Sequence, residues 1–479
     1  MLKQSISADD APGQAASLQE SSPTRLRKTP PGPHGYPIIG NLPQMLRNPL
    51  QFLTNAVRQY GDVVHLGAMG SQQLYLVAHP DHLKYILQEN SRNYIKGENF
   101  QAIKLVIGDG LAVKEGESWR RERHLMQPSF HRQKVGTLVN LMTKNIAQML
   151  ENWRNIDSDK PLDIFAEMMQ LAQTILLESL LSIDSDDEID KLNQAWDTAY
   201  KYLSSQLWAV IKLPLWVPTL KNRRFQQSMQ TLDGAIYRII RERREGSKSP
   251  DDLLSMLMDA YDQESGQGMS DEQLRDEIMT IFTGGFETSA AVLAWTWYLL
   301  SQNPSVEYQL QEEISRVLDG RTPTLEDLPS LKYTRMVIEE SMRLYPGAWV
   351  FTRTNLESDQ IGDYHIPARS LIMVSPYVTQ RLPSFWENPE EFNPERFARE
   401  QVAQRPRYAY FPFGGGPRQC IGEIFAMTEM QLVVAMIAQK YRLHSVPGHP
   451  VEEEAMFTLR PHHGILMTLE SQVSLVDAY

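Results

Sequence analysis

The residues best suited to chemistry gather around Cys420, the only cysteine among 479 residues. It lies in the segment FGGGPRQCIG, residues 413–422, and an apolar helical pattern follows. Glycines let the backbone fold closely around a sulfur atom and aim amide N–H groups at it, and the positive end of a following helix favours a thiolate. One cysteine cannot form an intramolecular disulfide. We therefore predict that Cys420 is a thiolate ligand of a metal.

The spacing around Cys420 resembles the haem-binding loop of the cytochrome P450 superfamily, Phe-x-x-Gly-x-Arg-x-Cys-x-Gly. Phe413, Arg418, Cys420 and Gly422 occupy positions of that pattern. The resemblance implies haem b with Cys420 as its axial ligand, Phe413, Arg418 and Gly422 at the cofactor, and O2 as co-substrate. The fold it implies is mainly α with a small β-rich lobe, the cytochrome P450 fold.

Two further segments carry side chains that the resemblance assigns to the haem propionates. Trp119 and Arg123 lie four residues apart, so they share one face of a helix. Taken alone, this pattern is more typical of a solvated basic helix. Arg353 matches a strand arginine of the family, and Arg123, Arg353 and Arg418 would together neutralise the two haem carboxylates. At Gln380 the family often has a histidine that also helps to bind a propionate, so this contact is not expected here.

The segment GGFETS, residues 284–289, resembles the oxygen-activation motif of the family's central helix. Gly284, where the family more often has alanine, lets a flat group approach the backbone. Thr288 can bond back into the preceding turn and leave a groove, and Glu287 supplies an acid for proton relay. A helix that is simply packed closely at Gly284, with a solvated Glu287, explains the same pattern equally well.

Three charged residues are expected to have a structural role. Glu340 and Arg343 form a Glu-x-x-Arg pair, which on most helices is superficial. In the family this pair forms a buried network with an arginine from an irregular segment, and Arg396 is the matching candidate. A buried charge requires such partners.

The resemblance also implies a reaction, a haem-thiolate monooxygenase that inserts one oxygen atom from O2 into a lipophilic substrate by hydroxylation or epoxidation. Fatty acids, terpenoids and polyketides are the candidate classes. An O2-independent isomerase or dehydratase and a non-catalytic haem or gas-binding protein are the alternatives. The expected substrate-pocket residues lie in the stretch 100–111 and after it: Phe100, Leu111, Thr283, Ala348, Trp349, Val350, Met456 and Phe457.

The elements that position these residues can be outlined from the sequence pattern. Short β-like runs at 63–66 and 74–77 precede a mostly helical region from 117 to 318, and residues 455–470 suggest a hairpin around His462 and His463. The apolar run 278–300 is long enough to cross a membrane, but Glu287 and two glycines at its centre favour a buried core helix. No internal repeat is evident.

The whole chain is expected to form a single catalytic domain over residues 30–479, after a disordered tail at residues 1–29. The tail is polar and contains no apolar signal or anchor segment, so we expect a cytoplasmic protein without a membrane anchor. Its net charge of −12 argues against nucleic acid as a partner. We expect a monomer.

Electrons are expected from a separate ferredoxin or flavodoxin, because too few residues follow Cys420 to form a reductase domain. Although the chain is acidic overall, arginines outnumber acids around the thiolate loop, which would attract an acidic carrier. The expected basic face comprises Arg120, Arg121, Arg132, Lys134, Arg396, Arg399, Arg405, Arg407 and Arg418.

Overall fold

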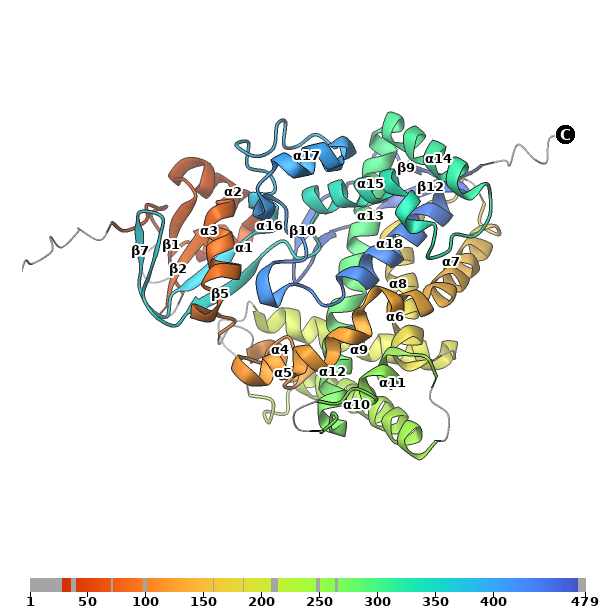
Figure 1. The fold of residues 1–479 in the computed structure, drawn as a ribbon, viewed down its shortest axis with the longest axis horizontal. Helices are drawn as coiled ribbons and strands as arrows, with labels where there is room; N and C mark the ends of the chain where they lie inside the picture. Colours follow the sequence, from red (N-terminus) through yellow and green to blue (C-terminus); the bar gives the residue numbers. More distant parts are fainter. Residues whose placement is uncertain are drawn as a thin grey trace, which may run out of the picture.

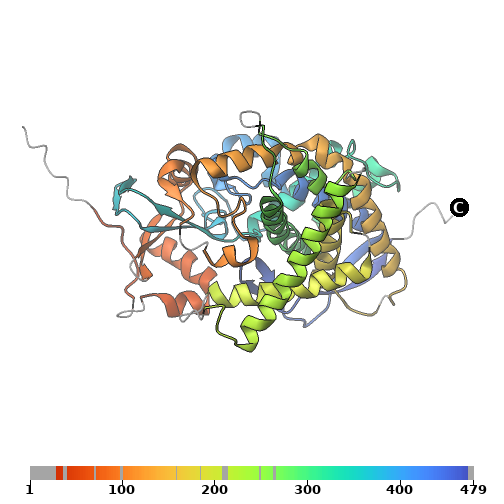
Figure 2. The same cartoon turned by 90° about the horizontal axis from the view of Figure 1, so that it is seen from below.

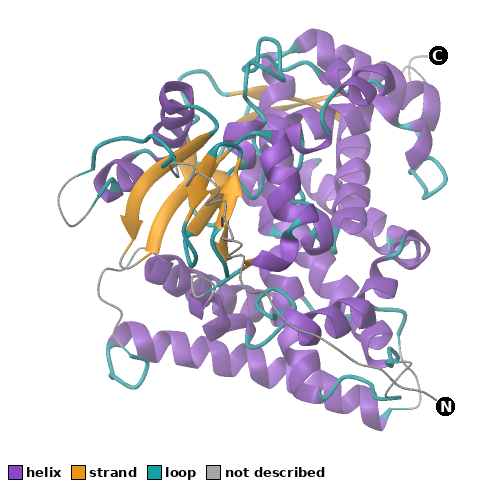
Figure 3. Ribbon diagram, turned by 60° about the vertical axis from the view of Figure 1, so that its left-hand side comes forward, coloured by secondary structure: helices purple, strands orange, loops and turns teal. Residues whose placement is uncertain are grey.

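The computed structural model describes residues 28–35, 40–69, 72–97, 101–157, 159–183, 185–207, 214–246, 250–262 and 266–472. Helices form the larger part of the molecule, and a lobe rich in strands lies beside them (Figure 1, Figure 3). The mainly α fold with a β-rich lobe is therefore confirmed. The described chain begins at Lys28, whose carbonyl accepts a hydrogen bond from His365 N at 3.0 Å. Residues 1–27 of the expected tail lie outside the described residues.

The α-helices have the following bounds: α1 (Leu42–Arg47), α2 (Pro49–Tyr60), α3 (Pro80–Lys84), α4 (Gln101–Ile107), α5 (Gly116–Met126), α6 (Arg132–Thr137), α7 (Val139–Trp153), α8 (Ile164–Leu181), α9 (Asp186–Leu207), α10 (Leu220–Glu245), α11 (Leu253–Met258), α12 (Asp271–Gly285), α13 (Glu287–Gln302), α14 (Pro304–Leu318), α15 (Lys332–Leu344), α16 (Pro376–Thr379), α17 (Arg399–Gln404) and α18 (Glu423–Ala438). The strands are β1 (Val63–Met69), β2 (Gln72–Val77), β3 (Tyr94–Ile95), β4 (Leu162–Asp163), β5 (Phe351–Asn355), β6 (Asp359–Ile361), β7 (Tyr364–Ile366), β8 (Leu371–Val374), β9 (Tyr441–Ser445), β10 (Glu453–Ala455), β11 (Leu459–Pro461) and β12 (Leu466–Ser471).

The β-rich lobe contains a five-stranded sheet with the strand order β1-β2-β8-β5-β3. Strand β2 runs parallel to β8, with Leu74 opposite Leu371, and the other neighbours are antiparallel. The expected β-like runs form β1 and β2. Apolar residues of the sheet, including Leu76 and Met373, pack with Leu53 of α2 in a core separate from that of the helices.

The helical part is built around α12 and α13, which together contain the apolar run expected at 278–300. Ser270 caps α12 in a capping box with Gln273. The helical run breaks at Phe286, next to the two glycines, and resumes at Glu287. Seen from below, α9 and α10 cross in front of these helices (Figure 2).

Among the residues that the structure describes, two helical stretches, Ile164–Leu181 and Asp271–Gln302, are long and apolar enough to cross a membrane. In each, 67% of the most apolar window is buried inside the protein. This burial explains the apolar composition, because a helix largely covered by other helices needs little polar surface.

The expectation of a hairpin turn at His462 and His463 is wrong. Strand β10 pairs with β11, and the turn between them is formed by Met456, Phe457 and Thr458. The histidines instead follow β11 and lead to β12, which pairs with β9 in a different sheet. Histidine-histidine-glycine looks like a turn in sequence, whereas Met456-Phe457-Thr458 contains no glycine, proline, asparagine or aspartate and gives no such signal.

Candidate active site

The loop before α18 places the Cys420 sulfur among backbone amides. Cys420 N donates to Phe413 O at 2.9 Å, which closes the loop. Gly416 has a φ of +68°, and a Cβ there would lie 1.8 Å from Leu87 O, so only glycine fits. Helix α18 begins at Glu423 with Gly422 as its N-cap, and the amides of both residues donate to the sulfur.

Burial raises the pKa of the Cys420 thiol, while the amides of Gly422 and Glu423 and the charge of Arg123 oppose this shift. The helix end therefore favours the thiolate as expected, but burial has the larger effect. The protein alone does not make Cys420 a strong acid. A coordinated metal would oppose the effect of burial, because metal binding favours the thiolate.

Cys420 borders a cavity of about 380 Å³ between the central helices and α18. Its walls are mostly apolar and come from segments distant in the sequence. The residues that line it include Lys96, Leu111, Phe130, Leu176, Thr280, Ile281, Gly284, Thr288, Val292, Gly347, Ala348, Phe351, Arg353, Phe413, Arg418, Gly422, Phe425 and Ala426.

Three cations line this cavity: Lys96, Arg353 and Arg418. Burial, together with the neighbouring charges of Arg353 and Arg418, lowers the pKa of Lys96 to about 7. Burial and the charge of Arg418 lower the pKa of Arg353 to about 10. Glu115, which is bonded to Arg418, is the acid that opposes both shifts. Lys96 was not predicted as a site residue. Its position between a short strand and Gly97 was the one feature of the sequence that could have indicated it.

The residues around the cavity fit haem. Two carboxylates would neutralise the crowded cations, and the Cys420 sulfur faces the same space. A Cβ added to Gly284 would meet no atom within 4 Å, so the glycine leaves room beside the central helix for a flat group.

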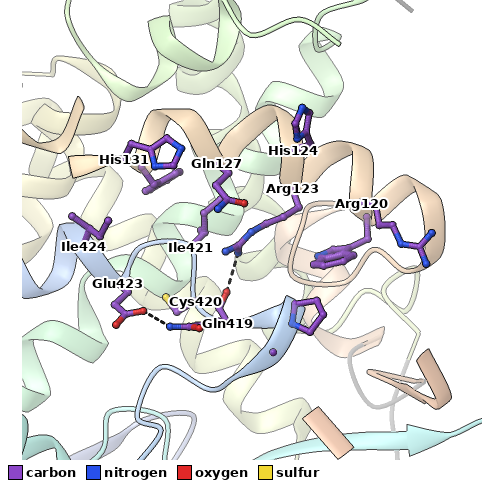
Figure 4. Close-up of a pocket in the computed structure, with 14 residues that line it drawn as sticks. Arg120, Arg123, His124, Gln127, His131, Gln419, Cys420, Ile421, Glu423 and Ile424 are labelled. Atoms are coloured by element: carbon purple, nitrogen blue, oxygen red, sulfur yellow. Dashed lines mark hydrogen bonds between the residues drawn. The ribbon is translucent and has the colours of Figure 1, made fainter. Parts of the chain in front are cut away.

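Trp119 and Arg123, expected beside Arg353 and Arg418, border a different space. They line a hollow of about 590 Å³ on the other side of the Cys420 loop. Figure 4 shows Arg123 extending from α5 towards Gln419, whose carbonyl accepts from Nη1 at 2.9 Å. The ring of Trp119 lies 4.0 Å from the Arg418 guanidinium. Trp119 thus contacts the cationic cluster through Arg418.

The structure brings Glu340, Arg343 and Arg396 together. Arg343 and Glu340 are fully buried and form two hydrogen bonds of 2.7 and 2.8 Å, and Arg396 Nε lies 3.3 Å from Glu340 Oε1. The remaining donors of Arg343 bond to the carbonyls of Gln380, Pro389 and Glu391. These contacts attach the irregular segment before the thiolate loop to α15.

Gln380 has a structural role in place of the family's frequent histidine. Its amide donates to the carbonyls of Met342 and Arg343, at 3.0 and 3.1 Å, and accepts from Phe411 N at 3.0 Å. The side chain is fully buried, so it joins the end of α15 to the chain that leads into the thiolate loop.

Thr288 and Glu287 are adjacent but have different surroundings. Thr288 lines the cavity, and its Oγ1 donates to Gly284 O at 2.9 Å, as expected for a helix groove. Glu287 is buried and is not among the residues that line the cavity. Its Oε1 accepts from Tyr200 OH at 2.8 Å and from Thr458 Oγ1 at 2.9 Å. No local sequence pattern indicated these two partners.

Of the expected substrate-pocket residues, Leu111 and Ala348 line the cavity. Thr283 instead bonds Met279 O at 2.7 Å, and Trp349 Nε1 donates to Met456 O at 2.9 Å. These residues are not among those that line the cavity, nor are Val350 and Phe457. Phe100 lies outside the described residues. Thr280 and Ile281 do line it, and their spacing of four and three from Gly284 was a usable signal.

Only some of the residues expected to form a basic face near the thiolate loop are exposed. Arg396 binds Glu340, Arg418 binds Glu115, and Arg405 packs 4.1 Å from the Trp386 ring. These three arginines point inward, because Arg396 neutralises a buried acid, Arg418 a partly buried acid, and Arg405 covers an aromatic ring. The exposed cations around the loop are Arg120, Arg132, Lys134, Arg399 and Arg407.

Comparisons with known proteins agree with this geometry. The chain is 34% identical over 436 residues to cyclooctatin synthase of Streptomyces melanosporofaciens, covering 89% of this chain and 92% of that protein. It is 32% identical to pentalenene oxygenase of Streptomyces avermitilis, covering 92% and 96%. A crystal structure of the cytochrome P450DA heme domain superposes with a TM-score of 0.85 at 24% identity, covering 94% of this chain and 98% of that one. The family model for cytochrome P450 matches residues 30–468. The chain belongs to the cytochrome P450 family, and it is a monooxygenase.

Proposed function

We propose that this monooxygenase inserts one atom of O2 into an unsaturated terpenoid, by hydroxylation or epoxidation, with electrons from a separate acidic ferredoxin or flavodoxin. The carrying observation is the cavity that places the Cys420 sulfur, a cluster of three cations and the Thr288 hydroxyl around one mostly apolar space. The domain over residues 30–479, the monomeric state and a cytoplasmic location belong to the same proposal. Burial of both membrane-length helices supports that location.

Each part of the site has a defined task in this reaction. Haem, bound through Cys420, supplies the iron that activates O2. Lys96, Arg353 and Arg418 orient it by binding its carboxylates. The apolar walls would exclude water and bind the substrate beside the haem. Thr288 directs a proton into the cavity, and Glu287 supplies that proton. Trp119 and Arg123 support the cluster and the loop from the other side.

The terpenoid class is supported by the walls of the cavity and by the relatives. Leu111, Ile281, Val292 and Ala348 offer no charged group to a substrate. The relatives include a cyclooctat-9-en-7-ol 5-monooxygenase and a pentalenene oxygenase, whose substrate names denote an unsaturated alcohol and an unsaturated hydrocarbon.

The electron carrier is proposed to dock at the hollow near Cys420. Arg120, Arg123, His124 and His131 line this hollow, and Cys420 lies at its base (Figure 4). An acidic carrier bound there would approach the thiolate by the shortest route. The exposed Arg407 extends the positive face.

The haem-loaded enzyme tests the proposal. A set of cyclic terpenes, fatty acids and polyketides is first screened for spectral displacement of water from the iron. The best ligand is then incubated with a reductase, a ferredoxin and ¹⁸O2, and we expect one labelled oxygen in the product. Cys420→Ser should lose the absorption band of the reduced carbon-monoxide complex. Product without ¹⁸O would favour an isomerase or dehydratase, and no product from any class would favour a gas-binding protein.

A further inference from the structure

The carboxyl of Glu287 is fixed outside the cavity by two residues from distant parts of the chain. Tyr200 is 87 residues and Thr458 is 171 residues away, and both donate to the same oxygen, Oε1. Arg460 Nη1 lies 3.9 Å from that oxygen. While these bonds are intact, the acid of the proposed relay stays apart from the cavity that Thr288 faces.

A short run of hydrogen bonds connects the cavity wall to Thr458. Gly347 lines the cavity, and its carbonyl accepts from Leu459 N at 3.1 Å. The neighbouring Trp349 donates from Nε1 to Met456 O at 2.9 Å. These two bonds fix both ends of the β10–β11 turn that carries Thr458. A displacement of the wall at Gly347 therefore moves the turn and acts on the bond between Thr458 and Glu287.

Tyr200 is fixed by the packing of its helix. It belongs to α9, and Trp196, one turn earlier, packs against Phe282 and Phe286 at ring distances of 4.9 and 5.9 Å. Phe282 lies in α12, and Phe286 lies at the break between α12 and α13. Helix α9 is thus anchored to the helices that carry Glu287, and the turn is anchored both to the cavity wall and to α13, where Trp295 Nε1 donates to Leu459 O at 3.0 Å.

We infer that Tyr200 and Thr458 are positioning residues that retain Glu287 outside the cavity until a substrate presses on Gly347 and displaces the β10–β11 turn. The carboxyl then turns towards Thr288 and transfers its proton to the hydroxyl, which passes its own proton into the cavity. Glu287 regains a proton from solvent, which reaches Arg460 and Glu454, whose side chains are 29% and 25% exposed. Proton delivery thus waits for substrate, and O2 is not reduced unproductively. This inference rests on the proposed relay through Glu287 and Thr288.

The pKa of the Glu287 carboxyl can be measured without catalytic turnover, so it tests the inference independently of activity. Burial raises the pKa of Glu287, and the hydrogen bonds from Tyr200 and Thr458 lower it. The charge of Arg460 lowers it further, whereas Asp197 raises it. Removing either hydroxyl should therefore raise the pKa of this carboxyl, which infrared difference spectroscopy can follow through its C=O band.

The variants are Tyr200→Phe and Thr458→Val, each of which deletes one hydroxyl. Tyr202→Phe is the matched control, because Tyr202 is on the same helix but bonds Asn222 at 3.1 Å. Thr458→Ser keeps the hydroxyl and should restore wild-type behaviour. We expect a higher pKa of Glu287 and a several-fold faster consumption of O2 without substrate in Tyr200→Phe and Thr458→Val. Neither change is expected in Tyr202→Phe.

The double variants with Glu287→Gln separate positioning from general damage. If the faster O2 consumption depends on a released carboxyl, it should disappear in Tyr200→Phe/Glu287→Gln. Persistence of the faster consumption in that background, or an unchanged pKa of Glu287 in both single variants, would overturn the inference. Full product yield per electron in Glu287→Gln alone would instead refute the relay of the proposed function, whatever the infrared titration shows.

Discussion

Thr288 and Thr283 make the same local contact on successive turns of the central helices, yet only Thr288 faces the cavity. Each hydroxyl donates to the carbonyl four residues earlier, at 2.9 Å for Thr288 and 2.7 Å for Thr283. The two side chains therefore differ in what they face and not in how they affect the helix. This pair allows the chemical role of a hydroxyl to be tested against a built-in control.

Thr288→Ala should keep substrate binding and haem content but release a larger share of the electrons as peroxide. The reason is that the hydroxyl that directs protons into the cavity is gone. Product formed per electron consumed, measured together with peroxide, checks this. Thr283→Ala should behave like the wild type. An equal loss of coupling in both variants would indicate a disturbance of the helix and not of proton delivery.

Glu429 is a buried acid on α18 that the proposed reaction does not use. Burial raises its pKa from 4.5 to about 8, and the Ser289 hydroxyl on α13 partly opposes this shift. The folded state therefore retains a proton that the unfolded chain releases. The contribution of the buried Glu429 carboxyl to the free energy of unfolding is fully present below about pH 4.5. It is lost as the pH rises through about 8, and the free energy of unfolding falls by up to about 1.4 kcal/mol per pH unit.

Glu429→Gln should therefore flatten the dependence of unfolding free energy on pH between 5 and 8, relative to the wild type. Urea unfolding at several pH values measures this. The exposed Glu326 offers a control, because Glu326→Gln should leave the slope unchanged. A wild-type slope in Glu429→Gln would mean that the carboxyl is already ionised in the folded protein.

At the scale of elements, α15 attaches the irregular segment that leads into the thiolate loop. Arg343 alone donates to the carbonyls of Gln380, Pro389 and Glu391. These bonds connect a regular helix to an irregular segment whose own backbone hydrogen bonds are local, such as that from Glu391 N to Asn388 O at 3.0 Å. The helix thereby determines where the Cys420 loop begins, although it contributes no metal ligand.

Removing either member of the buried pair, by Glu340→Ala or Arg343→Ala, should cost roughly 3–5 kcal/mol and impair haem retention, because it leaves an uncompensated buried charge. Unfolding midpoints and the ratio of haem to protein check this. On the same helix, Arg335 and Glu339 form a pair of 3.0 Å in which the Arg335 side chain is 59% exposed. Arg335→Ala should cost at most about 0.5 kcal/mol. Comparable losses at both pairs would contradict the assigned role of burial.

The sequence predicted the parts of the site whose spacing is local. The thiolate loop, the Glu340–Arg343 pair and the Gly284–Thr288 groove each depend on residues within a few positions of one another. The contacts of Glu287 with Tyr200 and Thr458 join segments that only the tertiary fold brings together, so no periodicity indicated them. The substrate-pocket residues were predicted poorly, because the direction of each side chain determines whether the residue lines the cavity. Thr283 lies on the wrong side of the helix, whereas Thr280 and Ile281 share the phase of Gly284.

For the whole molecule, charge is distributed unevenly over the surface. The net charge is −12, yet the hollow beside Cys420 is lined by the exposed Arg120 and the partly buried Arg123. Several arginines that were expected on the basic face instead make contacts inside the protein. The attraction for an acidic carrier therefore depends on a small number of side chains, including Arg120 and Arg407.

Reversing charge at both sites, by Arg120→Glu and Arg407→Glu, should slow reduction of the iron by an acidic ferredoxin at low salt. The difference should shrink at high salt, since the screening length falls from about 10 Å at 0.1 M to about 3 Å at 1 M. Stopped-flow measurements at two ionic strengths decide this. The same reversal at Arg223 and Arg224 of α10, exposed residues that do not line the hollow, is the control. Equal slowing in both double variants would place the docking site elsewhere.

The cationic cluster also constrains the order in which the protein can mature. Arg418 donates to Lys114 O across 304 residues of chain, and β2 pairs with β8 across a similar span. At about 5–20 residues per second, a ribosome needs roughly 15–60 s to synthesise the intervening chain. During that interval Lys96 is already translated, while Arg353, Arg418 and the Cys420 ligand are not yet complete. Capture of the cofactor is therefore a late event in biogenesis, and the first hundred residues must avoid aggregation without it.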